Sequence, residues 1–428
     1  MSIPDRIGKY EVKRLLGEGA TGTVYLAGDP FGQRDVALKV MKKLPSDVEA
    51  ARRYLRFFQN EAALAGKLRH PHIVSILDAG VEDPTGDEPI RYLVMEVIEG
   101  DPLTRYCERN ALLDLQRAVG VVYKVSKALE FANGIGVVHR DIKPANIMVK
   151  GDDFDIKVSD FGAAQLDRSE VTQVTGVGSP AYMSPEQLKG EQIDYRSDMY
   201  SLGAVLFHLL VGRRPFDGAN TFELMENILN VPAPLPSEHR TDTPPELDAV
   251  VARAMAKSRA DRYESWEELG GELAKLLVLD SGTADLSDAE KFAASRRLQF
   301  FQRFSDAELW EAVRPSAWRH HRAGEEVIRE DTADEHFYIV ASGLMKVTRR
   351  GKLLNAVSPG ECVGEMAYAR RDGRPRSATV TAVEPSWAMR LRVPDIDGLS
   401  ESCRARFNEA FLAIMAERLA MLGGRLLA

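Results

Sequence analysis

The stretch Val137–Lys150, VVHRDIKPANIMVK, followed by Lys157–Gln165, KVSDFGAAQ, decides the fold of the larger part of this 428-residue chain. It carries His139-Arg140-Asp141, then a lysine and an asparagine, and after a short gap an Asp-Phe-Gly triplet. A lone His-Arg-Asp triplet arises by chance, whereas an ordered set of this kind does not. The set therefore indicates one site, whose other parts are expected upstream.

A glycine pattern lies upstream, inside the segment Tyr10–Val40. Gly17, Gly19 and Gly22 form a Gly-x-Gly-x-x-Gly turn between two strand-like runs, and a third such run follows. An ordinary hairpin turn accounts for such glycines as well. A dinucleotide-binding fold is disfavoured, because it would place a helix after the loop, where the strand-like run Thr23–Ala27 stands.

Lys39 ends the next strand-like run, VALK, and a lysine inside a small sheet needs a counter-charge or a phosphate. A candidate partner lies in the helical pattern Tyr54–Val74, where Glu61 shares one face with the apolar residues Phe57, Leu64 and Leu68. An unpaired inward carboxylate would be costly, so we expect Lys39 and Glu61 to neutralise each other. The alternative is a surface glutamate and a lysine that extends to solvent.

Together these motifs resemble the eukaryotic-type protein kinases over roughly residues 8–277. The resemblance implies a bilobal fold and phosphoryl transfer from ATP, a reaction that depends on positioning and charge neutralisation. It assigns Lys39, held by Glu61, to the α and β phosphates, and Lys143 to the transferring phosphoryl group. Asp141 is expected to orient the acceptor hydroxyl and to take its proton.

The same resemblance implies the nucleotide and metal contacts. Asn146 and Asp160 are expected to supply oxygen ligands to Mg²⁺, with Mn²⁺ as an alternative. Amides of the glycine loop cover the phosphates, and an apolar slot holds the adenine. The expected contacts are the loop residues Gly17, Gly19 and Gly22, the slot residues Leu16, Val24, Ala37 and Met148, and the backbone of Met95, Glu96 and Val97.

The acceptor is expected to be a serine or threonine of a protein substrate, because the pattern Asp-x-Lys-x-x-Asn resembles the serine/threonine-specific branch. Ser179 keeps a hydroxyl where the family often has threonine. Thr172 and Thr175 lie in the activation segment and are candidates for autophosphorylation, since Arg140 could bind a phosphothreonine.

Three further residues are expected to hold the second lobe together: Glu186 paired with Arg262, and Asp198 as a cap on the catalytic loop. A scaffold that holds ATP without transferring phosphate is the alternative to an active kinase. It is disfavoured because the full set is present, namely Lys39, Asp141, Asn146 and Asp160.

After Leu277 the chain changes character. Residues 278–298 begin with an acidic, small-residue run and are expected to form a linker and a connecting helix. From about Phe300, short runs of alternating character separated by glycine and proline turns predict a small all-β roll. A final helix is expected to carry Cys403, Phe407, Phe411, Ile414 and Leu422.

The loop Cys362–Val380, CVGEMAYARRDGRPRSATV, is the candidate ligand site of this roll. Gly364 lets the backbone approach a ligand, and the amides after it form an anion-binding nest. Arg376 adds a fixed cation, and Glu365 suits a sugar hydroxyl, so the loop fits a ribose cyclic phosphate. The expected contacts are Gly364, Glu365, Met366, Ala367, Arg376 and Ser377.

Residues 299–428 thus resemble the cyclic-nucleotide-binding domains, although Arg376 follows Glu365 by eleven residues, two more than expected. The ligand that this resemblance implies is cAMP or cGMP, and the residues do not distinguish between them. The alternative is a roll that binds no nucleotide and serves as an interaction or dimerisation module, so a homodimer stays open.

The composition bounds the whole. A net charge of −8 and a pI near 5.7 argue against nucleic-acid and membrane-surface partners, and three widely spaced cysteines favour a cytoplasmic protein. We therefore expect an α+β chain with a kinase domain at 8–277, a linker and connecting helix at 278–298, and a β-roll with flanking helices at 299–428. The predicted protein is a serine/threonine kinase regulated by a cyclic nucleotide.

Overall fold

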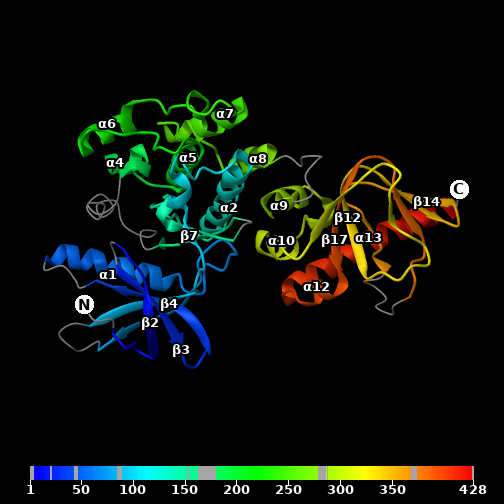
Figure 1. Cartoon of the computed structure of the whole chain (residues 1–428), viewed down its shortest axis with the longest axis horizontal. Helices are drawn as coiled ribbons and strands as arrows, with labels where there is room; N and C mark the ends of the chain where they lie inside the picture. Colours follow the sequence, from blue (N-terminus) through cyan, green and yellow to red (C-terminus); the bar gives the residue numbers. More distant parts are fainter. Residues whose placement is uncertain are drawn as a thin grey trace. The chain divides into compact units, whose positions relative to one another are not determined.

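The computed structural model describes residues 4–19, 22–42, 47–83, 89–151, 154–161, 180–277, 286, 288–366, 368 and 374–426. The chain divides into two compact units, Met1–Leu276 and Leu277–Ala428 (Figure 1). Each unit has a hydrophobic core of its own. Within the described residues, no helix combines the length and the apolar character needed to cross a membrane.

The first unit begins with a six-stranded antiparallel sheet in the order β1-β2-β3-β4-β6-β5. Alternation along β4 sends Val36 and Leu38 into the core on one face. Met41, on the other face, packs with Phe58 of α1 (Val48–Ala63), and Lys39 faces the same helix. The strands are β1 (Arg6–Ile7), β2 (Tyr10–Glu18), β3 (Gly22–Asp29), β4 (Arg34–Met41), β5 (Ile76–Glu82) and β6 (Ile90–Met95).

The helix predicted over Tyr54–Val74 was placed too far along the chain. The observed helix is Val48–Ala63, so of the two leucines expected on its inner face, Leu64 lies in the turn that follows and Leu68 directly after this turn. Gly66 in this turn adopts φ +74°, a left-handed conformation that ends a helical path. Both leucines are buried all the same, which is why their spacing imitated a longer helix.

The rest of the first unit is mainly helical. Its central helix, α5 (Tyr195–Val211), is buried around almost its whole circumference, and α2 (Leu115–Gly134) packs against it. A small antiparallel sheet, β7 (Asp101–Pro102), β8 (Ile147–Lys150) and β9 (Asp155–Val158), lies beside them, and its β8–β9 hairpin brings the segment before β8 next to the segment after β9. The other helices are α4 (Pro185–Lys189), α6 (Thr221–Asn230), α7 (Pro245–Ala254) and α8 (Trp266–Leu276), with 3₁₀ turns η1 (Leu103–Cys107), η2 (Pro144–Asn146), η5 (Pro180–Tyr182), η6 (Pro236–Glu238) and η7 (Arg259–Asp261).

The second unit is a roll of two four-stranded antiparallel sheets, β10-β17-β12-β15 and β11-β16-β13-β14. Side chains from both sheets, among them Val340, Met345 and Val380, form its core. The strands are β10 (Ala317–His321), β11 (Glu326–Ile328), β12 (His336–Ser342), β13 (Met345–Arg349), β14 (Lys352–Val357), β15 (Cys362–Val363), β16 (Thr379–Ala382) and β17 (Ser386–Arg392).

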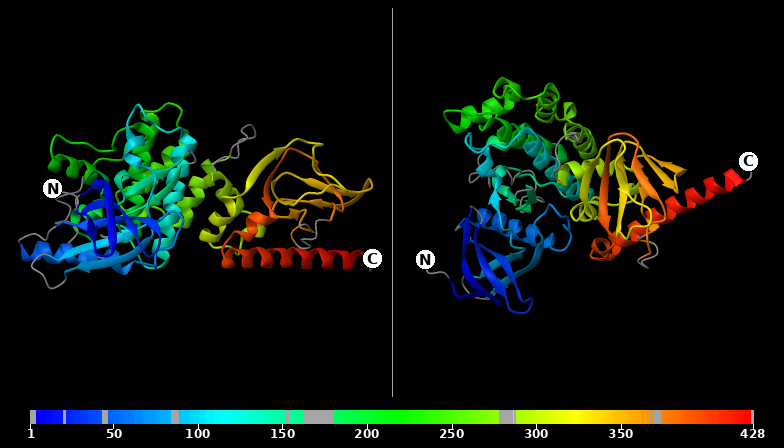
Figure 2. Two further views of the ribbon diagram at one scale, coloured as in Figure 1. Left: turned by 60° about the horizontal axis from the view of Figure 1, so that its bottom comes forward. Right: turned by 45° about the vertical axis from the view of Figure 1, so that its right-hand side comes forward.

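Helices flank this roll on both sides in the sequence. α9 (Asp288–Arg296), η8 (Gln299–Phe301) and α10 (Asp306–Val313) precede it, and α12 (Val393–Asp397) and α13 (Glu401–Leu426) follow it. Figure 2 shows α13 as a long helix that runs along one side of the roll. Phe407 and Phe411 of α13 contact Phe300, which ties the last helix to the segment before the roll.

The predicted α+β class, the roll and the final helix are confirmed. The alternating runs of the sequence correspond to β11, β12, β13, β16 and β17. Three strands, β10, β14 and β15, were not predicted. β14 shows the reason, because its Leu353 and Leu354 are both exposed, so the strand has no alternating apolar face to detect.

Candidate functional site

A buried lysine joins two carboxylates at the centre of the first unit. Lys39 of β4 is 6% exposed, and its Nζ donates to Glu61 Oε1 at 3.2 Å and Oε2 at 3.1 Å. The same Nζ donates to Asp160 Oδ1, which follows β9. The predicted pairing of Lys39 with Glu61 is therefore present, and Asp160 is a second partner that the sequence did not predict.

Charge neutralisation explains why Lys39 tolerates burial, whereas for Glu61 burial outweighs Lys39 and leaves its pKa above the ordinary value. Burial lowers the pKa of Lys39, but the charges of Asp160 and Glu61 outweigh it and leave this pKa above its ordinary value. Burial raises the pKa of Asp160, but Lys39 overcomes it and leaves that pKa below its ordinary value. A cation shared by two carboxylates thus holds Asp160 ionised, as a metal-binding group must be.

The segment before β8 brings three polar side chains together. Lys143 Nζ donates to Asp141 Oδ2 at 2.7 Å. Asn146 Nδ2 donates to Asp141 Oδ2 at 3.0 Å and to the backbone O of Asp141 at 2.8 Å. The carboxylate of Asp141 is therefore oriented by a cation and an amide, and its side chain remains 40% exposed.

Asp198 of α5 anchors this segment, as predicted. Its Oδ2 and Oδ1 accept the backbone N–H groups of His139 and Arg140, both at 2.7 Å. Burial leaves the pKa of Asp198 above its ordinary value, although the hydrogen bonds from the N–H groups of His139 and Arg140 oppose this rise. A helix at the centre of the lobe thereby fixes the backbone that leads into Asp141.

The Asp-Phe-Gly segment is held from the same side. Asp160 adopts φ +63°, an uncommon left-handed conformation for a non-glycine residue. Phe161 is buried against the ring of His139, with centroids 4.4 Å apart, and His139 Nε2 lies 2.9 Å from Ser159 O. These contacts fix the two segments that flank the β8–β9 hairpin to each other.

The glycine loop connects β2 and β3 as predicted. A Cβ on Gly22 would lie 2.5 Å from the backbone O of Val40, so only glycine fits at this crossing. Gly17 pairs with Val24 across the hairpin, and Gly19 N–H donates to Gly22 O at 2.8 Å. The tips of the two strands are therefore held in a closed turn near Lys39, whose partner on β3 is Val24.

The expected adenine slot lies around β4 and the end of β6. Ala37 is buried and pairs with Met95, Met148 of β8 is partly buried, and Leu16 is more than a third exposed. Glu96 differs from expectation in one respect, because its N–H donates to Ser75 O at 3.1 Å and is not available to a base. Its carboxylate accepts from Ser75 N–H at 2.7 Å and from Lys157 Nζ at 2.6 Å, a connection that the sequence did not predict.

The predicted pair Glu186–Arg262 is present as a two-fold hydrogen bond. Arg262 Nη1 donates to Glu186 Oε1 at 2.7 Å, and Nη2 donates to Oε2 at 2.9 Å. The exposed fraction is 0% for the Arg262 side chain and 2% for the Glu186 side chain. Gly162, Thr172, Thr175 and Ser179 lie outside the described residues.

In the second unit a buried arginine from the end of the ligand loop contacts the start of that loop. Arg376 is 6% exposed, and its guanidinium contacts Asp334 Oδ2 at 3.1 Å, Gly364 O at 3.0 Å and His336 O. Its Nε–H is buried, and no described residue accepts a hydrogen bond from it. Gly364 adopts φ +79°, and a Cβ there would lie 2.9 Å from Arg376 Nη1, so the close approach requires glycine.

Comparison with known proteins relates both units to families. Residues 10–270, well over half of the chain, match the family model described as the protein kinase domain. The chain belongs to the protein kinase family. Residues 318–403 match the model described as the cyclic nucleotide-binding domain, which covers most of the roll.

Bacterial serine/threonine kinases are similar to this kinase. PknB of Mycolicibacterium smegmatis is 37% identical over 300 residues, which are 68% of this chain and 47% of that protein. PrkC of Bacillus subtilis is 37% identical over 276 residues, which are 64% of this chain and 41% of that protein. This kinase therefore spans about half the length of the curated relatives it matches. The crystal structure of the Mycobacterium tuberculosis PknI kinase domain matches 64% of this chain and 99% of its own, with 30% identity and a TM-score of 0.51.

The ligand loop of the kinase's second unit is described in part. Glu365 and Met366 are partly buried after Gly364, Ser377 is exposed, and Ala367 lies outside the described residues. The sequence did not predict Asp334 and its neighbour His336 as partners of Arg376, because they lie some 40 residues earlier. Burial raises the pKa of Asp334, but hydrogen bonds from His336 and the charge of Arg376 leave it below its ordinary value.

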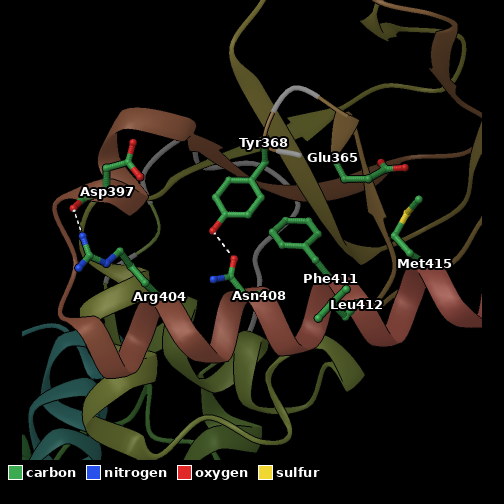
Figure 3. Close-up of a pocket in the computed structure, with 8 residues that line it drawn as sticks. All are labelled: Glu365, Tyr368, Asp397, Arg404, Asn408, Phe411, Leu412 and Met415. Carbon is green, nitrogen blue, oxygen red and sulfur yellow. Dashed lines mark hydrogen bonds between the residues drawn. The ribbon is translucent and has the colours of Figure 1, made fainter. Parts of the chain in front are cut away.

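A cavity of about 600 Å³ lies between this loop and α13 of the kinase (Figure 3). Tyr368 and Phe411 stack in its wall with centroids 4.7 Å apart, and Tyr368 Oη donates to Asn408 Oδ1 at 2.8 Å. Its lining is formed by Glu365, Tyr368, Asp397, Arg404, Asn408, Phe411, Leu412 and Met415. Of these, only Glu365 was predicted as a ligand contact, since all the others except Tyr368 lie in α12 and α13, beyond the loop, and carry no motif.

Proposed function

We propose that this kinase transfers the γ-phosphoryl group of ATP to serine and threonine hydroxyls of proteins. The observation that carries the proposal is the buried Lys39, which joins Glu61 to Asp160. A lysine in this position can neutralise the charge of the nucleotide phosphates, while Glu61 holds its ammonium group in place. The serine/threonine class is supported by Lys143 beside Asp141 and by the names of the similar bacterial kinases.

Asp141 is the base in this proposal. Its carboxylate is fixed by Lys143 and Asn146 yet partly exposed, so a substrate hydroxyl can reach it. Asp141 orients that hydroxyl and accepts its proton, and Lys143 neutralises charge on the transferring group. No covalent bond to the protein is needed, because phosphoryl transfer depends on positioning and charge.

The residues present fit a divalent cation. Both hydrogen bonds of Asn146 to Asp141 use Nδ2, which leaves its Oδ1 for a cation. Lys39 occupies Oδ1 of Asp160, whereas Oδ2 accepts a long hydrogen bond of 3.5 Å from Ser159 Oγ, which a cation could displace. Two protein oxygens completed by phosphate oxygens suit Mg²⁺ or Mn²⁺, which would neutralise the phosphate charge when bound. Within the described residues, no cluster of three His, Cys, Asp or Glu offers a metal site independent of the nucleotide.

ATP would lie between the glycine loop and the end of β6. The glycine loop with Gly17, Gly19 and Gly22 would cover the phosphates with its amides, although the Gly19 N–H is held by Gly22 O in this structure. The apolar side chains Leu16, Val24, Ala37 and Met148 would surround the adenine. The Glu96 N–H is taken by Ser75 O, so the adenine would form its hydrogen bonds with the Glu96 carbonyl and with a backbone N–H further along the chain. Met95 would lie behind the adenine and Val97 beside it.

The proposed activity is tested with the full chain, radiolabelled ATP, Mg²⁺ and a generic protein acceptor. The expected result is incorporation of label that phosphoamino-acid analysis locates on serine and threonine. Asp160→Asn should abolish it, and mass spectrometry should find phosphate on Thr172 or Thr175. Label on tyrosine alone, or equal labelling by Asp160→Asn, would contradict the proposal.

We further propose that the second unit binds cAMP or cGMP and thereby regulates the kinase. The buried, unpaired Nε–H of Arg376 beside Gly364 supports a phosphate ligand, and Glu365 supports a ribose hydroxyl. The cavity beside Glu365, with its stacked Tyr368 and Phe411, has room for a purine. A coupling of roughly 1–3 kcal/mol would change activity about 5- to 150-fold.

Calorimetric titration of the full chain with each cyclic nucleotide tests this second proposal. Saturable binding is expected, with loss in Arg376→Ala and no change in Arg329→Ala, an exposed arginine of the same unit. Kinase assays with and without the bound nucleotide then test regulation. Absence of binding would favour the alternative, an active kinase whose roll serves as an interaction or dimerisation module.

The domain division and the location of the protein complete the proposal. We assign the kinase domain to residues 8–277, the linker and connecting helix to 278–298, and the cyclic-nucleotide-binding domain to 299–428, although 278–285 and 287 lie outside the described residues. We assign the protein to the cytoplasm, which is supported by the wide spacing of Cys107, Cys362 and Cys403 in the sequence.

A further inference from the structure

The peptide that leads into Asp141 has an unusual conformation. Arg140 adopts φ +68°, a left-handed conformation that a side chain disfavours. Such a conformation persists only where neighbouring groups hold it. Asp198 holds one side of it, because its carboxylate accepts the N–H groups of His139 and Arg140.

A glutamine from α4 holds the other side. Gln187 is 3% exposed, and its Nε2 donates to the backbone O of Arg140 at 2.7 Å. Its Oε1 accepts from the N–H of Ser184 at 3.0 Å and lies 3.1 Å from Ser184 Oγ. These bonds fix the orientation of the side-chain amide, since the opposite one would face its oxygen towards the Arg140 carbonyl.

We propose that Gln187 is a positioning residue for Asp141, an inference that rests on the proposed phosphotransfer. The peptide between Arg140 and Asp141 is planar, so a hydrogen bond to the Arg140 carbonyl also fixes the N–H and Cα of Asp141. With Asp198 on one side and Gln187 on the other, the backbone that aims the Asp141 carboxylate is fixed at both ends.

The same side chain connects the catalytic loop to the segment that follows residues 162–179. Ser184 and Gln187 form the reciprocal cap at the start of α4, and Glu186 between them is paired with the buried Arg262. The anchor of Gln187 is therefore rigid. A change in how this segment is held would reach Asp141 through one hydrogen bond.

Gln187→Glu is the sharpest test, because it keeps the shape and the acceptor for Ser184 but replaces the donor with an oxygen that faces the Arg140 carbonyl. We expect kcat to fall about tenfold or more, because small displacements of a reacting group are costly. The KM for ATP should stay within about twofold, because the nucleotide contacts lie elsewhere. Gln187→Ala, which removes the bond without adding repulsion, should lower kcat less.

Gln116→Glu is the matched control, since Gln116 is exposed and its Nε2 donates to the Leu276 carbonyl at 3.1 Å, away from Asp141. It should leave kcat unchanged. Hydrogen exchange measured by mass spectrometry gives a second readout, in which Gln187→Glu should speed exchange at His139 and Arg140 with little change in α7.

A kcat within twofold of the wild type in both Gln187 variants would overturn the proposal, as would unchanged exchange at His139 and Arg140. A loss of kcat accompanied by an equal loss of ATP-binding sites would also overturn it, since a misfolded fraction explains that result. Failure of the wild-type chain to transfer phosphate would instead refute the proposed function, and the exchange measurement would still decide whether Gln187 holds this backbone.

Discussion

Replacing Arg262 with methionine should strongly destabilise the first unit. Arg262 is buried, and its guanidinium donates to both carboxylate oxygens of Glu186 and to the backbone carbonyls of Ala256, Arg196 and Lys257. Methionine fills similar space but donates no hydrogen bond. The variant therefore leaves Glu186 as a buried carboxylate without its cation.

The magnitude follows from this burial. Breaking a buried ion pair by removal of one partner costs about 3–5 kcal/mol, whereas exposed pairs contribute about 0–1 kcal/mol. We expect Arg262→Met to lower the free energy of unfolding by about 3–5 kcal/mol at pH 7. Since whole domains are stable by about 5–15 kcal/mol, the loss should be large enough to measure without ambiguity.

The effect should depend on pH in a definite direction. Burial raises the pKa of Glu186, but Arg262 outweighs it, so in the wild type this pKa lies below its ordinary value. The wild-type pair therefore stabilises the fold above the unfolded pKa, and this stability is lost as pH falls through the folded pKa. In Arg262→Met burial still raises the pKa of Glu186, and only hydrogen bonds such as that from Ser197 Oγ oppose it, so Glu186 can protonate as pH falls. The difference between the two proteins should shrink from pH 7 towards pH 4.

Native-state hydrogen exchange in α5 and α7 measures the opening free energy of this unit directly. Arg105→Met is the matched control, since Arg105 pairs with Asp101 on the surface and should change stability by less than about 0.5 kcal/mol. Glu186→Gln combined with Arg262→Met should be more stable than Arg262→Met alone. A cost below about 1 kcal/mol for Arg262→Met, or a cost that grows at low pH, would refute the reasoning.

Three further predictions concern other parts of the chain. Lys39→Met should reduce phosphotransfer by about a hundredfold or more, because Glu61 and the phosphates lose their cation; activity near the wild-type level in a folded variant would contradict this. Burial lowers the pKa of His208 to about 4, so on acidification the unfolded state takes up a proton before the folded state does. The free energy of unfolding should therefore fall as pH drops from about 6.5 to 4, and urea unfolding of His208→Gln should show a smaller fall over the same range. Tyr368→Phe removes one hydrogen bond to Asn408 and should destabilise the second unit by about 1 kcal/mol in the same kind of measurement, whereas no change would show that this bond is replaced by water.

Much of the kinase site could be predicted because its groups carry charge at fixed spacing. Lys39 and Glu61 were paired by a simple argument, namely that two inward charges must meet, and the structure has them in contact. Glu186 and Arg262 followed from the resemblance to kinases, and their contact is also present. In such cases burial leaves little freedom, so the residue type alone restricts the partner.

Contacts between groups without a motif were not predictable. Gln187 donates to the backbone O of Arg140, and Lys157 donates to the carboxylate of Glu96. Nothing in the sequence around either residue indicates these partners. The extent of α1 was also misjudged, because buried residues beyond a helix end keep the same apolar spacing for another turn. The ligand loop was found from the order of Gly364, Glu365 and Arg376 within it, but the cavity beside it depends on Phe411 and other residues of a distant helix.

The measurement that tests the central claim most directly is the single-turnover rate of phosphoryl transfer by the full chain with Asp141→Asn. Asp101→Asn, a change in an exposed surface pair, serves as the control. We predict a loss of at least about a hundredfold in Asp141→Asn with unchanged ATP affinity, and the wild-type rate in Asp101→Asn. An Asp141→Asn variant that transfers phosphate at the wild-type rate would contradict the assignment of this carboxylate as the base and, with it, the account of the site.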